Sequence, residues 1–213
     1  MALAFGLASC KKGDDVPATT QTTNLNVINA GTDTLNYYVN GTRINISSSL
    51  YPLGSSGYIG VSVGKQSYDF KKPRSPVVLL NLNLVLDSGK AYSLYVAGRS
   101  PDLAFSSIDT LKTDTASRAM IRVVNASPDA GNLDISIAKD TIRFNKRAFK
   151  TTTIFLPVKA GPKSVRVFET GSAIAKIDET RTLVAGRIYT LFIKGSLNGV
   201  GGNALGTGLV VNR

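Results

Sequence analysis

Few residue types in this 213-residue chain could carry out chemistry, and their spacing excludes several reactions. The sequence contains one cysteine, no histidine and no tryptophan. An internal disulfide, Cys/His zinc sites and histidine-dependent catalytic triads are therefore excluded. Two Ser-x-x-Lys patterns, formed by Ser62 with Lys65 and by Ser136 with Lys139, match a serine hydrolase spacing that needs a helical turn. Both lie in strand-like sequence, where residues three apart point to opposite faces, so neither pattern predicts a hydrolase site. From these exclusions together we expect no enzyme, no metal site and no cofactor.

The single cysteine, Cys10, follows an apolar stretch at residues 1–8. This stretch is far shorter than the roughly 20 residues of a membrane-spanning helix and is typical of the end of a signal-peptide h-region. Leu7-Ala8-Ser9-Cys10 resembles the lipobox of bacterial lipoproteins, in which the cysteine thiol receives the lipid. The resemblance implies a membrane partner, reached through a lipid anchor at Cys10. The alternative is an ordinary buried cysteine behind a ragged terminus.

Residues 11–23, KKGDDVPATTQTT, lack the apolar side chains needed for a core and predict a flexible tether. The charged segment directly after Cys10 resembles the lipoprotein-export signals of Bacteroidetes, which direct lipoproteins to the outer face of the outer membrane. We therefore assign residues 1–21 to a signal-peptide remnant, lipobox and tether, and expect a cell-surface location on the outer membrane. A merely solvated linker is the alternative.

The rest of the chain alternates between apolar and polar residues with a period of two, as in Tyr92-Ser93-Leu94-Tyr95-Val96. Gly, Asn, Asp and Pro separate these short segments, and Asn40-Gly41 is a type I′ hairpin signal. No amphipathic helix of ten or more residues is evident. The pattern predicts an all-β protein built as an antiparallel sandwich or barrel.

An internal repeat with an offset of 97 residues divides the chain. Residues 86–98 match residues 183–195, and residues 64–67 match residues 161–164. The unit length predicts two tandem immunoglobulin-like antiparallel β-sandwich domains, at residues 22–116 and 117–213. The repeat also predicts a positive φ at Gly89 and Gly186, and tyrosine hydroxyls that reach the backbone near a corner at Tyr92 and Tyr189.

Two segments of the second repeat resemble a known family. Residues 120–135, MIRVVNASPDAGNLDI, and residues 185–191, AGRIYTL, are similar to the opening and the ending of the domain-of-unknown-function 4397 family. The resemblance implies β-sandwich domains, often in tandem, in secreted or lipid-anchored bacterial proteins. The family has no established activity, so it assigns no catalytic residues. The first repeat departs from the pattern at residues 31–33, where Gly-Thr-Asp replaces Ser-Pro-Asp.

Positive charge is concentrated in the second repeat, which carries 15 basic and 6 acidic residues and so a formal charge of +9. The first repeat, with 8 basic and 6 acidic residues, has a charge of +2. Arg143, Lys146, Arg147 and Lys150 surround two phenylalanines and indicate contact with an anionic partner, either lipid headgroups, an acidic glycan or an envelope protein. Nucleic acid is disfavoured by the extracytoplasmic address. The alternative is a solvated face that keeps a basic protein soluble.

These observations favour a non-enzymatic cell-envelope lipoprotein that acts as a binding or scaffold module of unknown ligand. A glycan-binding accessory lipoprotein of a surface polysaccharide system is the second interpretation. The absence of tryptophan removes the best stacking platform for sugars, and Tyr37, Tyr38, Tyr51 and Tyr58 are poorer substitutes.

Overall fold

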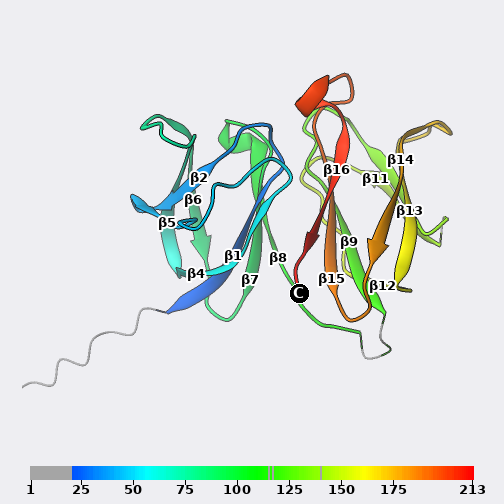
Figure 1. Cartoon of the computed structure of the whole chain (residues 1–213), viewed down its shortest axis with the longest axis horizontal. Coiled ribbons are helices and arrows are strands. Elements are labelled where there is room, and N and C mark those ends of the chain that lie inside the picture. Colours follow the sequence, from blue (N-terminus) through cyan, green and yellow to red (C-terminus); the bar gives the residue numbers. More distant parts are fainter. Residues whose placement is uncertain (1–20, 115, 117, 140) are drawn as a thin grey trace, which may run out of the picture.

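The computed structural model describes residues 21–114, 116, 118–139 and 141–213 of the chain. The described residues form β-strands and two short 3₁₀ turns, so the predicted all-β class is confirmed (Figure 1). The strands build four four-stranded sheets, which combine into two β-sandwich halves. No helix within the described ranges is long and apolar enough to cross a membrane.

The first half consists of the sheets β4-β1-β7-β8 and β3-β2-β5-β6. Strand β1 is antiparallel to β4 and parallel to β7, and the other neighbours in both sheets are antiparallel. The elements are β1 (Thr22–Asn29), β2 (Asn36–Val39), β3 (Thr42–Arg43), β4 (Ser55–Ser62), β5 (Gly64–Lys71), β6 (Val78–Leu86), β7 (Ala91–Val96), the turn η1 (Pro101–Leu103) and β8 (Ala104–Ile108).

The second half repeats this arrangement in the sheets β12-β9-β15-β16 and β11-β10-β13-β14. Strand β9 is parallel to β15, as β1 is to β7, so the expected antiparallel arrangement is wrong at this one strand pair in each half. The predicted tandem repeat is therefore confirmed strand by strand. The elements are β9 (Ala119–Asn125), β10 (Leu133–Ile137), β11 (Ile142–Arg147), β12 (Leu156–Val158), β13 (Gly161–Glu169), β14 (Ala175–Leu183), β15 (Ile188–Lys194), the turn η2 (Gly201–Asn203) and β16 (Gly206–Val211).

The immunoglobulin-like strand order expected from the sequence is not confirmed. In a constant-type immunoglobulin domain the first, second, fifth and fourth strands share one sheet. Here the first and fourth strands lie in one sheet, while the second and fifth lie in the other. The period of two shows which face of a strand is buried but not which strand lies beside it, so the pattern alone could not establish the order.

Two turn predictions are confirmed by the backbone geometry. Asn40 and Gly41 have φ values of 47° and 84° and join the paired strands β2 and β3, as a type I′ turn requires. Gly89 and Gly186 have φ values of 71° and 75° at equivalent positions of the two repeats. Side chains with a Cβ rarely adopt this conformation, which explains glycine at both sites.

The paired tyrosines also adopt the predicted role. The Tyr92 hydroxyl accepts a hydrogen bond from the backbone N–H of Asp87 at 3.2 Å. In the second half the Tyr189 hydroxyl accepts one from the backbone N–H of Val184 at 3.0 Å. Both rings are buried, so each tyrosine fills its core and satisfies a backbone donor beside the turn.

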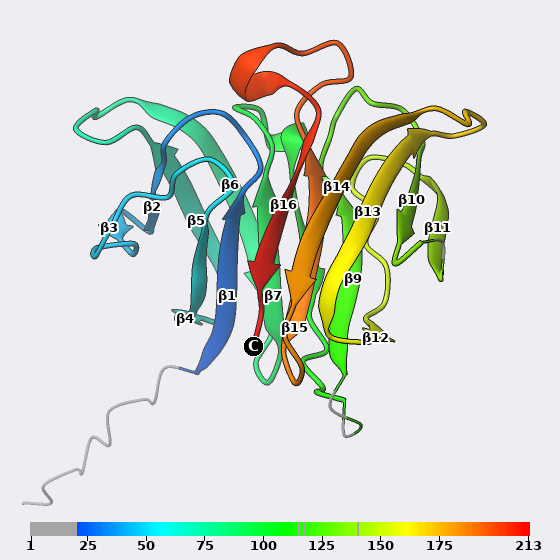
Figure 2. The same ribbon diagram turned by 45° about the vertical axis from the view of Figure 1, so that its right-hand side comes forward.

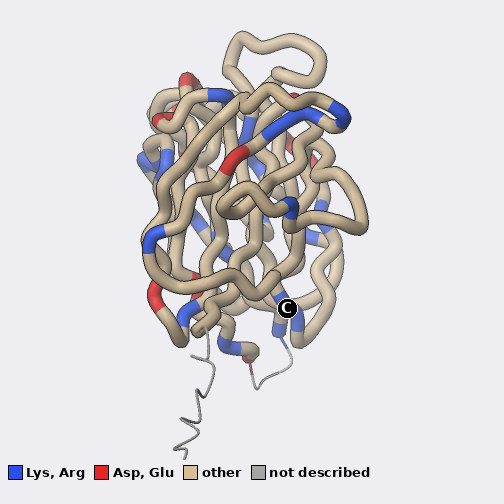
Figure 3. The backbone as a smooth tube through the Cα atoms, turned by 90° about the vertical axis from the view of Figure 1, so that its left-hand side faces the viewer, with Lys and Arg blue, Asp and Glu red and all other residues tan. Residues whose placement is uncertain are grey.

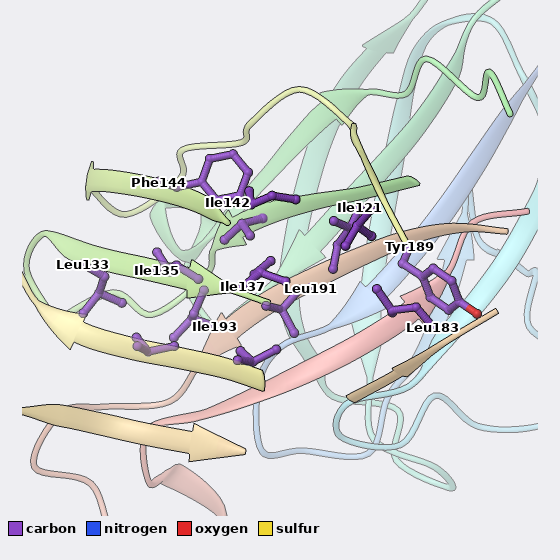
Figure 4. Packing of buried hydrophobic residues seen from close by; sticks show 14 of the residues in the cluster. Ile121, Leu133, Ile135, Ile137, Ile142, Phe144, Leu183, Tyr189, Leu191 and Ile193 are labelled. Atoms are coloured by element: carbon purple, nitrogen blue, oxygen red, sulfur yellow. The ribbon is translucent and has the colours of Figure 1, made fainter. Parts of the chain in front are cut away.

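Each half has its own hydrophobic cluster between its two sheets. The first cluster includes Tyr37, Tyr68 and Phe70, all fully buried. The second is dominated by aliphatic side chains such as Ile135 and Leu191 (Figure 4). The boundary expected between residues 116 and 117 falls in the connection between β8 and β9.

A third hydrophobic cluster joins the two halves. Ile28 and Tyr95 of the first half belong to it, together with Val124, Phe192 and Val210 of the second. The sheets β4-β1-β7-β8 and β12-β9-β15-β16 therefore face each other in the middle of the molecule (Figure 2). We call this contact the seam, and it gives the central strands two buried faces.

A buried ion pair crosses the seam beside this cluster. The Arg122 guanidinium lies 2.5 Å from the Asp109 carboxylate, and the two side chains are 1% and 0% exposed. Arg122 also donates to the hydroxyls of Thr190 and Tyr95, and Asp109 accepts from the Tyr58 hydroxyl at 2.5 Å. Burial, followed by the charge of Asp109, raises the pKa of Tyr58 far above its usual value, so its hydroxyl stays protonated.

Candidate functional site

The outer face of the second half contains a hollow of about 240 Å³ that is lined by charged, polar and apolar residues. It lies on the sheet β11-β10-β13-β14, on the side away from the core. Alternation along the strands explains this, because Ile135 and Val167 point into the core while their neighbours point outward. We call it the arginine hollow, and its lining includes Asp134, Ser136, Arg143, Asn145, Arg166, Phe168 and Ser172.

The register of the sheet aligns two arginines across the arginine hollow. Ser136 of β10 pairs directly with Arg143 of β11 on one side and with Arg166 of β13 on the other. The three side chains therefore form one row across three strands, with a hydroxyl between two guanidinium groups. The Arg166 guanidinium lies 5.6 Å from the centre of the Phe168 ring, so it sits over the aromatic face.

Asp134 supplies a fixed carboxylate at the edge of the same hollow. It accepts hydrogen bonds from the Thr170 hydroxyl and from the backbone N–H of Lys146, both at 2.7 Å. Burial raises the pKa of Asp134, but the bond from Thr170, a backbone amide and the charge of Arg143 outweigh it, so the pKa lies below its usual value. The carboxylate is thus ionised at neutral pH and helps to hold β11 in place.

The four cations expected to contact an anion lie along β11 and the turn that follows it. Arg143 lines the arginine hollow, whereas Lys146 occupies a strand irregularity with a φ of 54°. The Arg147 side chain is half-buried, and Lys150 lies beyond the end of β11. The Lys150 ammonium is 5.5 Å from the ring centre of Phe149, which in turn packs edge-on against Phe105 of the first half.

The other chemically notable residues have structural surroundings. Ser62 and Lys65 lie on successive strands, β4 and β5, and Lys139 follows β10 with a φ of 52°, so neither Ser-x-x-Lys pattern is helical. Among the described residues, no group of three or more His, Cys, Asp or Glu side chains could hold a metal ion. Cys10 and its lipobox lie outside the described residues.

Arg166 and Phe168 could not be recognised as site residues from the sequence alone. They lie on β13, which is separated from Arg143 of β11 by a connection that contains β12, and only the sheet register brings them together. The available signal was the alternation Ser164-Val165-Arg166-Val167, which places Arg166 on the face opposite the core.

A comparison with protein-family models matches residues 23–136 and 119–210 to "Domain of unknown function (DUF4397)". The chain belongs to the DUF4397 family. The two matches overlap and together cover both repeats, so the resemblance noted at residues 120–135 and 185–191 is confirmed. No match was found among curated proteins.

The Asn-Ala-Ser-Pro-Asp stretch of the second DUF4397 repeat has a structural role. The Asn125 side chain is fully buried, donates to the carbonyl of Arg147 at 2.9 Å and accepts from the Ser127 amide at 2.9 Å. The Asp129 carboxylate accepts a hydrogen bond from Ser196 at 2.5 Å. The Asn125 bond ties the end of β9 to the end of β11, and the Asp129 bond ties the β9–β10 connection to the segment that follows β15. We therefore place the candidate site in the arginine hollow instead.

Three solved structures show distant similarity to this DUF4397 chain. The C-terminal domain of AlgF from P. aeruginosa has 19% identity and a TM-score of 0.31, covering 45% of this chain and 98% of that domain. A family 41 carbohydrate-binding module from streptococcal virulence factors, described for α-glucan recognition, has 13% identity and a TM-score of 0.27. A second streptococcal α-glucan-binding structure has 9% identity and the same TM-score, and both cover 81% of this chain and 93% of their own.

Proposed function

We propose that this chain is a non-enzymatic binding module of the bacterial cell envelope, and that the arginine hollow holds an acidic glycan. The supporting observation is the row in which Arg143 and Arg166 flank Ser136 on an outward sheet face. Guanidinium groups bind carboxylates through paired hydrogen bonds, and their planar geometry gives the contact a defined orientation. A scaffold role without a glycan is the alternative function.

The remaining lining fits a charged sugar better than a neutral one. Asn145 and Ser172 provide amide and hydroxyl groups suited to sugar hydroxyls. Phe168 is only 9% exposed and lies under Arg166, so it offers no open ring for a sugar to stack on. Recognition at this site would therefore depend on charge and hydrogen bonds rather than on aromatic stacking.

The double variant Arg143→Gln/Arg166→Gln is expected to bind acidic glycans at least about tenfold more weakly, because it loses two charged hydrogen-bond donors. Binding can be measured on a glycan array and by calorimetry with uronic-acid oligosaccharides at low and physiological salt. The affinity of the unchanged protein should fall as salt rises, since partly exposed charges are screened.

The matched control is Lys139→Gln/Lys159→Gln, which removes the same charge at two exposed positions outside the hollow. It should keep most of the binding. An equal loss of affinity in both double variants would mean that glycans bind through the overall positive charge of the protein and not through the arginine hollow. A protein that binds no acidic glycan but captures an envelope protein through the same arginines would refute the glycan assignment.

We also propose that the module is lipid-anchored through Cys10 and displayed on the outer membrane, because Leu7-Ala8-Ser9-Cys10 resembles a lipobox. The full precursor should incorporate labelled fatty acid and partition into membranes, whereas Cys10→Ser should do neither. Two acyl chains suffice for stable attachment, at about 0.8 kcal/mol for each buried methylene. Equal labelling of both proteins would refute the anchor without affecting the arginine hollow.

A further inference from the structure

Strand β6 forms an open edge of the first half. It ends the sheet β3-β2-β5-β6 and, among the described residues, pairs only with β5. Its sequence, VLLNLNLVL, contains no charge, proline or glycine, whereas the neighbouring strand β5 contains Lys65, Asp69 and Lys71. Figure 3 shows the molecule from the side of the first half, with the charged positions in blue and red. Val78 and Val85 of β6 are 42% and 67% exposed. Such long, neutral, apolar edges present backbone groups to which another strand can add.

The second repeat protects the equivalent edge. Strand β14 also ends its sheet, but it carries Lys176, Asp178, Glu179 and Arg181. Glu179 and Arg181 form an ion pair at 3.0 Å and occupy the positions of Leu82 and Leu84 at the offset of 97. Charged edge strands oppose strand addition. The contrast within one chain indicates that β6, and not β14, is suited to pairing.

We propose that β6 pairs antiparallel with β6 of a second copy of this chain, about a two-fold axis at Leu82. The sequence is symmetric around this residue, because Leu80-Asn81-Leu82-Asn83-Leu84 reads the same in both directions. The pairing places Asn81 opposite Asn83 of the second copy. It is isologous and closed, so it yields a dimer rather than a fibre.

The exposed side chains near the ends of β6 fit the same register. Exposed Val85 comes to lie opposite Leu79 of the second copy and loses contact with water.

Sedimentation velocity over a range of concentrations tests this pairing in the full chain with Cys10→Ser, which removes both the thiol and the lipid. We expect a monomer–dimer equilibrium. Adding Asn81→Lys and Asn83→Lys should weaken the dimer at least about tenfold, because like charges then face each other twice. Adding Asn81→Lys and Asn83→Glu should restore it, because each introduced lysine then faces an introduced glutamate.

The matched control is Asp178→Lys/Thr180→Lys, which places lysines at the equivalent positions of β14 and should leave the dimer intact. Circular dichroism verifies that all variants fold. A protein that is monomeric at every concentration, or that forms open aggregates, would overturn the proposal. A dimer that the two-lysine β6 variant leaves unchanged would also overturn it.

Discussion

Replacement of Arg122 by methionine is expected to lower the free energy of unfolding by about 3–5 kcal/mol. The substitution keeps an apolar side chain of similar length but leaves the Asp109 carboxylate, which is 0% exposed, without its cation. A buried charge without a partner is far more costly than the exposed ion pairs of the surface. Urea denaturation followed by circular dichroism measures the change.

Two further variants separate the ion pair from simple packing. Adding Asp109→Leu to Arg122→Met removes the stranded charge and should recover much of the lost stability, because a buried pair can often be replaced by apolar residues at little cost. Arg99→Met, which breaks an exposed pair with Asp33 at 2.7 Å, should cost no more than about 1 kcal/mol. If Arg122→Met and Arg99→Met lowered the free energy of unfolding by similar amounts, the Arg122–Asp109 pair would not be buried and the two halves would not be in contact at the seam.

The strand-level features of each repeat could be predicted because they depend on local sequence. The φ values at Asn40 and Gly41 follow from the turn chemistry of those two residues. The offset of 97 relates each position of one repeat to a position of the other, so the sequence alone pairs Tyr92 with Tyr189, and both make the same hydrogen bond. The absence of histidine also excludes histidine-dependent triads from the sequence alone.

The seam could not be predicted, because it depends on which outward faces meet. Strand β15 is buried at six successive positions, from Ile188 to Ile193, which reads as a strong strand but does not reveal what covers its second face. Arg122 contributes to the basic excess of the second repeat, although it lies in the least exposed ion pair among the described residues. Charge totals cannot separate a buried cation from a solvated one.

The candidate site was only partly predictable for a related reason. Arg143 was recognised because it lies in a run of cations, and such runs are visible in sequence. The run itself does not form the site, since Lys150 lies beyond the end of β11 and next to Phe149, which packs against the first half. The partner of Arg143 in the arginine hollow is Arg166, which only the pairing of β10 with β11 and β13 brings near.

Truncation of Phe192 is expected to have an effect as large as loss of the ion pair. Phe192 is 0% exposed and belongs to the seam cluster with Ile28 and Tyr95, not to the core of its own half. Its ring lies so close to Gly208 that a Cβ at position 208 would overlap with it. Phe192→Ala should therefore cost about 3–5 kcal/mol in urea unfolding, the range for a large side chain removed from a packed interior.

The size of this loss tests whether the seam is closed in solution. If the halves moved apart, Phe192 would be exposed and its truncation would cost little, as for Ile154→Ala at a position that is 74% exposed. Ile28→Ala combined with Phe192→Ala should also be non-additive by at least about 0.5 kcal/mol, because both residues belong to one cluster. Additive losses, or a loss at Phe192 no larger than that at Ile154, would mean that the two sandwich halves do not pack together.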